Sequence, residues 1–168
     1  RQQLTAELLG ITRLNGMRAV AIARSDSLEA ADYFQAQLGQ GEKNAAALAA
    51  RLAALPTAPD ERALVDAATR RKAAYLQVRQ QVFQAKDLGK TQDVEQIVAG
   101  ELATRFDAYT HAIDALLAWQ TREAHAMAAA SAQAYAFSRV LLPAFGAAAL
   151  LVGCMAGWLL TRSIVTPL

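Results

Sequence analysis

Lys72, Tyr75 and Arg79 are the residues of this sequence whose types and spacing are best suited to binding chemistry. They are three and four residues apart, so on an α-helix they fall within roughly 60° of one another. Ala68 and Val82 share that face, so two cations occupy positions where the pattern predicts apolar side chains. Because an unpaired buried charge is costly, each cation needs an anionic partner or a route to water.

These residues predict a site for an organic anion. Arg79 would give two parallel hydrogen bonds to a carboxylate, Lys72 would add a second charge, and Tyr75 would offer a hydroxyl or a stacking face. Tyr109, on the apolar stripe of a later helical segment, could face the same space. The alternative is that both basic side chains extend along the bundle surface and reach water.

Three further polar residues are candidates for a secondary ligand contact or a dimer interface: Asn15, Arg18 and Arg71. Asn15 and Arg18 lie on the otherwise apolar face of the first helical segment, where an interface role is the favoured interpretation. Arg71 belongs to a basic run with Lys72, and such runs are usually solvated.

The sequence gives no support for catalysis or for a cofactor. It has no nucleophile elbow, no glycine-rich phosphate loop and no paired His or Cys spacing for a metal ion. Its only histidines, His111 and His125, are fourteen residues apart and are interpreted as surface residues. The net charge of +2 is too small to indicate nucleic acid as a partner. We therefore expect no enzyme, no metal and no cofactor.

Helical periodicity organises the chain into four segments, at about residues 1–25, 28–55, 60–87 and from 92 onward. The sequence around Ser27 and Asp60 offers N-cap chemistry, and Gly89 is placed to end the third segment. Gly39 and Gly41 are expected to interrupt the second segment. No stretch alternates like a strand. Short connections favour antiparallel neighbours, so the sequence predicts an all-α, up-down-up-down four-helix bundle.

Residues 140–160 predict a transmembrane helix that continues the fourth segment. They contain no charged residue, and at about 1.5 Å per residue they span roughly the 30 Å of a bilayer's hydrocarbon core. The predicted domains are a bundle over residues 1–138, a membrane helix over 139–161 and a short linker over 162–168. Because the sequence begins with Arg1 rather than Met, we expect it to be a segment of a longer protein. If the bundle lies outside the inner membrane, we also expect a first membrane helix to precede residue 1.

The order of several short motifs resembles the periplasmic sensor domain of bacterial chemoreceptors, the methyl-accepting chemotaxis proteins. The resemblance covers nearly all 168 residues. It rests on LNGMR at 14–18, PDERAL at 59–64, AYLQVR at 74–79, LGK at 88–90, FDAY at 106–109, and a membrane helix followed by RSIVTPL, which is similar to the start of a HAMP linker.

The resemblance implies a homodimer, or a higher oligomer, in the bacterial inner membrane, with its sensor domain in the periplasm. It implies a small organic acid bound between helices in the membrane-distal part of the bundle. The ligand would be a di- or tricarboxylate such as malate or citrate, or an aromatic acid, held by Lys72, Tyr75, Arg79 and Tyr109. The alternatives are the sensor domain of a membrane histidine kinase or cyclase, and a ligandless bundle that binds a periplasmic partner protein.

Overall fold

A computed structural model describes residues 1–131, 153 and 155 of the chain. The contacts divide the chain into two compact units, Arg1–Arg122 and Glu123–Leu168. The first unit contains all the side chains of the predicted site.

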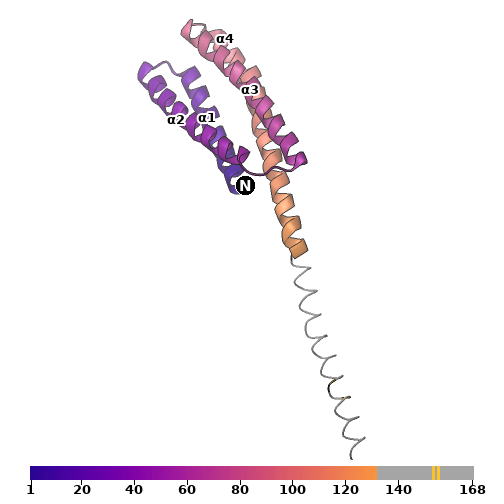
Figure 1. Ribbon diagram of the computed structural model, residues 1–168. Coiled ribbons are helices and arrows are strands. Elements are labelled where there is room, and N and C mark those ends of the chain that lie inside the picture. The colour runs from indigo at the N-terminus through magenta and orange to yellow at the C-terminus, as the bar shows by residue number, and fades with distance from the viewer. Residues whose placement is uncertain (132–152, 154, 156–168) are drawn as a thin grey trace, which may run out of the picture. The chain divides into compact units, whose positions relative to one another are not determined.

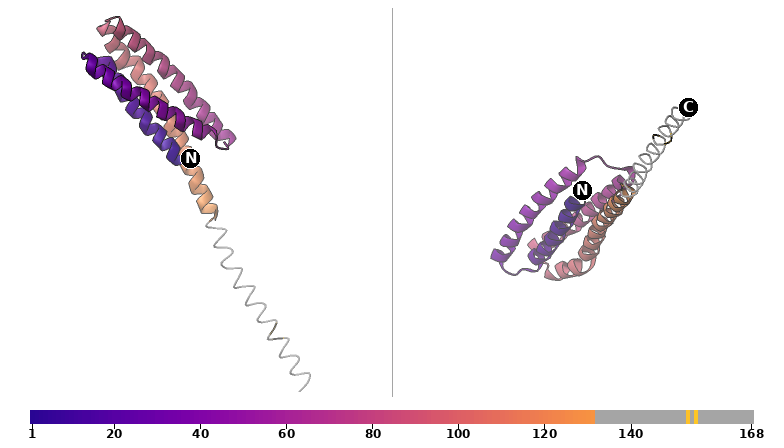
Figure 2. Two further views of the ribbon diagram at one scale, coloured as in Figure 1. Left: turned by 60° about the vertical axis from the view of Figure 1, so that its left-hand side comes forward. Right: turned by 90° about the horizontal axis from the view of Figure 1, so that it is seen from below.

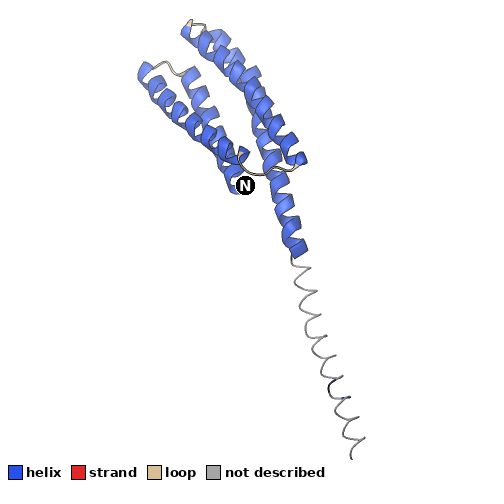
Figure 3. Cartoon of the chain, viewed as in Figure 1, coloured by secondary structure: helices blue, strands red, loops and turns tan. Residues whose placement is uncertain are grey.

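The first unit is built from antiparallel helices joined by short connections (Figures 1 and 3). Its first hairpin consists of α1 (Gln2–Arg24) and α2 (Leu28–Ala53), and its second begins with α3 (Pro59–Asp87). The returning arm of the second hairpin runs through α4 (Thr91–Ile97), the π-helical turn η1 (Val98–Leu102) and helical residues 103–122. The views in Figure 2 show the same up-down-up-down order. The described residues contain no strand, so the predicted four-helix bundle is confirmed.

Local capping explains where α2 begins and where α3 ends. Ser27 is the N-cap of α2, because its hydroxyl oxygen accepts a hydrogen bond from the Ala30 amide at 3.3 Å. Gly89, with φ of +69°, ends α3: its amide donates to Lys86 and the Lys90 amide donates to Ala85. Both caps were predicted from the sequence.

Two sequence expectations about local structure were wrong. Helix α3 begins at Pro59 with Ala58 as N-cap and no capping side chain, so Asp60 lies inside the first turn instead of capping it. Proline is well suited to that first position because its missing N–H would be unpaired there in any case. Helix α2 runs without a break through Gly39 and Gly41. Gly41 is buried and leaves room for the side chain of Asn15 on α1.

The core lies between the two hairpins. Its main cluster joins Leu9 and Ala23 of α1 to buried residues of α3 and of the returning arm: Tyr75, Val78, Val82, Ala85, Val94, Val98, Leu102, Tyr109 and Ile113. A smaller cluster fills the α1–α2 hairpin with Ala19, Ile22 and Leu38. The tyrosines of the predicted site therefore belong to the core, so the fold itself fixes their positions.

Lys86 ties the end of α1 to α3, because its ammonium donates to the carbonyl oxygens of Ile22 and, at 2.8 Å, of Ser25. These carbonyls lie at the negative end of the helix dipole, which favours a cation. We expect Lys86→Met to lower the free energy of unfolding by about 1–2 kcal/mol in urea titrations. The control is Lys90→Met, at an exposed lysine that makes no described side-chain hydrogen bond. Equal stabilities of the two variants would contradict this role.

In the second unit, residues 123–131 are helical and exposed. The predicted membrane helix over 139–161 lies outside the described residues apart from 153 and 155, and the predicted linker over 162–168 lies wholly outside them. Among the described residues, no helix combines the length and the apolar character needed to cross a bilayer.

Candidate functional site

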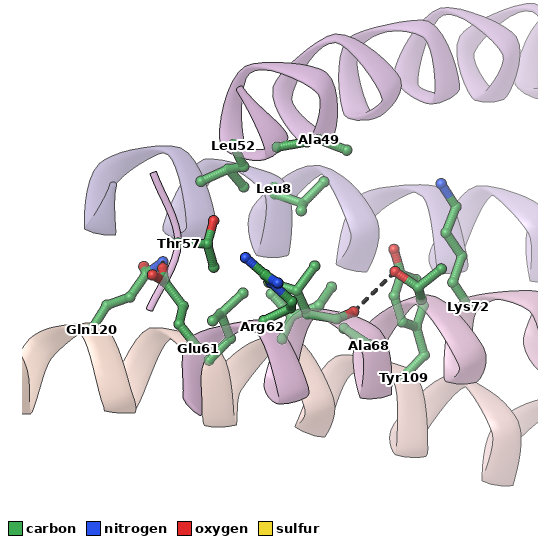
Figure 4. Close-up of a pocket in the computed structure, with 15 residues that line it drawn as sticks. Leu8, Ala49, Leu52, Thr57, Glu61, Arg62, Ala68, Lys72, Tyr109 and Gln120 are labelled. Atoms are coloured by element: carbon green, nitrogen blue, oxygen red, sulfur yellow. Dashed lines mark hydrogen bonds between the residues drawn. The ribbon is translucent and has the colours of Figure 1, made fainter. Parts of the chain in front are cut away.

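A cavity of about 440 Å³ lies between the two hairpins of the first unit, and we call it the inter-hairpin cavity. Leu8 of α1 and residues from the end of α2 form one wall, whereas α3 and helical residues 103–122 form the other (Figure 4). Most of its lining is aliphatic: Leu8, Ala49, Leu52, Ala53, Val65, Ala68, Ile113 and Leu116. An apolar wall with a few convergent polar groups is typical of a small-molecule site.

Lys72 and Tyr109 form one end of the inter-hairpin cavity (Figure 4). Lys72 is half-buried and makes no ion pair among the described residues. Tyr109 is 7% exposed, and burial raises the pKa of its hydroxyl, a rise that Thr12 beside it partly opposes. The hydroxyl is thus neutral at physiological pH and is suited to hydrogen bonding next to a cation.

Glu61 and Gln120 form the opposite end (Figure 4). Glu61 is only 3% exposed, and its two carboxylate oxygens are bound by Arg1 and, at 2.8 Å, by the Gln120 amide nitrogen. Its buried charge is therefore paired and hydrogen-bonded, as burial requires. Arg62 follows Glu61 on α3, lines the same cavity and is exposed.

Tyr75 and Arg79 do not line the inter-hairpin cavity and lie beyond Tyr109, which does. The rings of Tyr75 and Tyr109 are stacked with centroids 6.2 Å apart, and the Arg79 guanidinium lies 5.8 Å from the centroid of the Tyr75 ring. Arg79 also pairs with Glu42 of α2, so this chain already supplies a carboxylate to it. Tyr109, Tyr75 and Arg79 are therefore neighbours in the core, and of the four predicted residues Lys72 and Tyr109 line the inter-hairpin cavity.

Tyr75 lines a second cavity, of about 320 Å³, together with Phe106, Val98 and part of α1. This smaller cavity lies nearer the turns that end the first and third helices, where the family resemblance implies the ligand. The inter-hairpin cavity lies toward the α2–α3 connection. The smaller cavity contains no cationic side chain, so it lacks the charge that an organic acid requires.

The secondary candidates lie elsewhere. Asn15 is buried against Gly41, and Arg18 donates hydrogen bonds to Asn15 at 3.1 Å and to Gln37 of α2 at 3.2 Å. These two residues thus connect α1 to α2. Arg71 is exposed on α3, and His111 and His125 are exposed, as predicted.

Sequence reasoning missed Glu61, Arg62 and Gln120. Glu61 lies in the first turn of its helix, where acidic residues are common because they interact favourably with the positive end of the helix dipole. Its burial depends on Arg1 and Gln120, which are about sixty residues away on either side. The only available signal was a Gln at a position in register with the apolar stripe of the last segment, four residues after Leu116.

The burial of Tyr75 predicts how the free energy of unfolding depends on pH. Burial raises the pKa of its hydroxyl, and the charge of Arg79 opposes this only in part. Between about pH 10, where an unfolded tyrosine titrates, and the higher folded pKa, the folded state holds a proton that the unfolded state releases. The free energy of unfolding should therefore fall as pH rises past about 10, and should be unaffected by this group below that.

Tyr75→Phe is expected to make that alkaline fall shallower. At neutral pH it should be neutral or slightly stabilising, by up to about 1 kcal/mol, because the buried Tyr75 hydroxyl has no hydrogen-bond partner among the described residues. Urea unfolding at pH 8 and pH 10.5 measures both effects. Tyr33→Phe, at a tyrosine that is 61% exposed, is the control. Parallel pH dependences for wild type and Tyr75→Phe would refute the argument.

A helical bundle with an amphipathic cavity between its hairpins is the architecture of a ligand-binding module, since such sites are built from side chains on facing helices. The profile of a family described as "four helix bundle sensory module for signal transduction" matches residues 10–135. The match covers most of the chain, which therefore belongs to this family of chemotaxis-type sensory modules. No curated protein matches the chain significantly.

Membership of the family has two consequences. Modules of this kind are periplasmic sensor domains of membrane receptors, and the family is a signalling family, not a catalytic one. The resemblance in the sequence motifs is confirmed by the match.

Proposed function

We propose that this chain is the sensor region of a bacterial chemoreceptor that binds a small aromatic acid in the inter-hairpin cavity. The observation that carries the proposal is Lys72: a half-buried cation without a described ion-pair partner, at the end of a largely aliphatic cavity. The acid group would pair with Lys72 and accept a hydrogen bond from Tyr109. The module would lie in the periplasm, anchored by the predicted membrane helix at residues 140–160.

The cavity wall favours an aromatic acid over malate or citrate. Di- and tricarboxylates carry charge along their whole length, and besides Lys72 the lining offers them one further cation, Arg62, whereas the rest of the wall, including Leu8, Leu52 and Ile113, would desolvate their charge. An aromatic ring instead gains from burial there, at roughly 25 cal/mol per Å² of apolar area. The aliphatic lining therefore supports the aromatic member of the two predicted ligand classes.

Tyr75 and Arg79 would act through Tyr109 in this proposal. Arg79 is held by Glu42 and lies over Tyr75, which stacks on Tyr109. Substituting Arg79 should therefore weaken binding less than substituting Lys72. Asn15 and Arg18 would maintain the α1–α2 contact, and Arg71 remains available for contacts in the proposed homodimer.

Binding would be transmitted as a shift of one helix. The ligand would touch α3 and helical residues 103–122 at the same time, and packed helices respond by shifts of about 1–2 Å between discrete arrangements. The ligand would favour one arrangement by its difference in affinity for the two. The shift would pass along the chain toward a chemotaxis output.

A melting-temperature panel on the 168-residue chain tests the ligand class. At 100 times its Kd a ligand stabilises by about 2.7 kcal/mol, which corresponds to a rise of roughly 5–10 °C for a chain of this size. We expect such a rise with cinnamate or 3-phenylpropanoate, and none with cinnamamide, which has the same shape without the charge. A rise with malate or citrate alone would overturn the choice of class. No rise with any acid would favour a ligandless bundle.

A further inference from the structure

Glu61 joins three helices at the end of the inter-hairpin cavity opposite Lys72. Its carboxylate is bound by Arg1, at the start of α1, and accepts a hydrogen bond of 2.8 Å from the amide nitrogen of Gln120 on the returning arm. Glu61 is 3% exposed and Gln120 is 5% exposed, so both side chains lie away from water. A buried carboxylate that loses a donor is costly, so this contact favours one arrangement of the helices.

The spacing of residues along two antiparallel helices shows what this contact positions. On α3, Lys72 follows Glu61 by eleven residues. On the returning arm, Tyr109 precedes Gln120 by the same interval. Both intervals are helical and correspond to roughly 16 Å along the axis. The hydrogen bond at one end of the cavity therefore brings Lys72 and Tyr109 to the same level at the other end, which both residues line (Figure 4).

A second contact between the same helices has the same register. On α3, Tyr75 follows Lys72 by three residues, and on the returning arm Phe106 lies three residues before Tyr109. The rings of Tyr75 and Phe106 pack with centroids 5.3 Å apart. Such apolar packing has little directional preference. The hydrogen bond to Glu61 is directional, so it is the contact that a slide of about 1–2 Å between the helices would break.

Gln120 is the residue of the returning arm that can specify its axial position at this end. The arm residues that line the cavity between Tyr109 and Gln120 are Ile113 and Leu116, and both are aliphatic. Aliphatic side chains would pack about equally well after a small slide. A buried polar contact among apolar neighbours, in contrast, is a well-attested means of fixing the register of one helix against another.

We infer that Glu61 is a positioning residue of the inter-hairpin cavity. Through Gln120 it sets the axial position of the returning arm against α3, and this holds Tyr109 level with Lys72 at the far end. Glu61 acts on the bound acid through these helices and does not touch it. The effect on binding rests on the proposed function, whereas the register of the two helices can be measured without a ligand.

The double variant Glu61→Leu/Gln120→Leu tests the inference, because it replaces the buried polar pair by apolar side chains of similar size. Arg1 is partly exposed and can turn to water. The melting temperature should therefore equal or exceed that of the wild-type chain. The affinity for cinnamate in isothermal titration should nevertheless fall about three- to tenfold, because Tyr109 no longer keeps one position beside Lys72.

The direction of the affinity change separates positioning from electrostatics. The double variant removes a negative charge from the cavity, and the loss of that charge alone would strengthen the binding of an anion. Weaker binding must therefore come from the position of the helices. Glu61→Gln removes the same charge but keeps an oxygen that accepts a hydrogen bond from the Gln120 amide. It should retain at least the wild-type affinity.

Spin labels on the two helices measure the register directly. The labelled chain carries Gln80→Cys on α3 and Ala115→Cys on the returning arm, both at exposed positions, and Cys154→Ser removes the native thiol. Double electron–electron resonance on the ligand-free chain should give one narrow distance distribution. The double leucine variant should give a broader distribution or one displaced by about 1–2 Å, and Glu61→Gln should match the parent chain.

The outcomes separate the inference from the proposed function. A distance distribution that the two leucines leave unchanged overturns the inference, and so does an affinity for cinnamate that stays the same or rises. If the double variant does not fold, Gln120→Leu alone, which leaves Glu61 paired with Arg1, replaces it in both measurements. If the wild-type chain binds no acid, the proposed function fails, and the spin labels alone decide whether Glu61 sets the register.

Discussion

Gly16→Ala is expected to destabilise the first unit by about 1–3 kcal/mol, although alanine is the better helix former. A Cβ atom at Gly16 would lie 2.2 Å from Cζ and 2.3 Å from Cε2 of the Phe106 ring. The ring packs against Tyr75 at a centroid distance of 5.3 Å, so it can give way only by disturbing the core. The substitution therefore forces a shift of α1 against the second hairpin.

Gly10→Ala, on the same helix, is expected to change the stability in the opposite direction. A Cβ atom there would meet nothing within 4 Å, so the variant should gain about 0.5–1 kcal/mol from the lower entropy of its unfolded chain. Thermal or urea unfolding compares the two variants directly. Combining Gly16→Ala with Phe106→Leu should recover part of the loss, since the two sites are in contact. A stabilising Gly16→Ala would show that α1 does not pack on Phe106.

Lys72→Met is expected to weaken binding of an aromatic acid by about ten- to a hundredfold. A hydrogen bond to a charged group contributes roughly 1.5–3 kcal/mol, and the variant keeps the stem that lines the inter-hairpin cavity. The loss should appear in the affinity for cinnamate measured by titration calorimetry. The stability of the ligand-free chain should change little, because Lys72 makes no described ion pair.

Arg62→Gln is the matched control for Lys72→Met. Arg62 also lines the cavity, but it lies between Glu61 and Lys72 and is exposed, so it should contribute less to a carboxylate bound beside Lys72 (Figure 4). A larger loss of affinity in Arg62→Gln than in Lys72→Met would reverse the orientation of the ligand. Equal affinities for wild type and both variants would remove the cavity from consideration as the anion site.

The helices could be predicted from the sequence because their signals are local. Periodicity, the Ser27 cap and the Gly89 terminator each act within a few residues, and the structure places helix ends close to the predicted positions. The η1 turn could not be predicted in this way. Its five residues, Val98–Leu102, carry no sequence signal that distinguishes a π-turn from a helix weakened by Gly100.

The candidate site was predictable in part, for a similar reason. Tyr75 and Tyr109 lie on the apolar stripes of their helices, and two stripes that face the same core bring their members together. The pairing of Arg79 with Glu42 depends on the register between α2 and α3, which no local pattern specifies. The burial of Gln120 and Glu61 has the same origin, because it depends on three residues that lie far apart in the sequence.

A crystal structure of the 168-residue chain grown with cinnamate tests the central claim most directly, because it locates the ligand. We predict one molecule between the hairpins, with its carboxylate within hydrogen-bond distance of Lys72 Nζ and its ring against Leu8, Leu52 and Ile113. A ligand bound in the Tyr75 cavity or between two copies of the chain, with the inter-hairpin cavity empty, would contradict the claim.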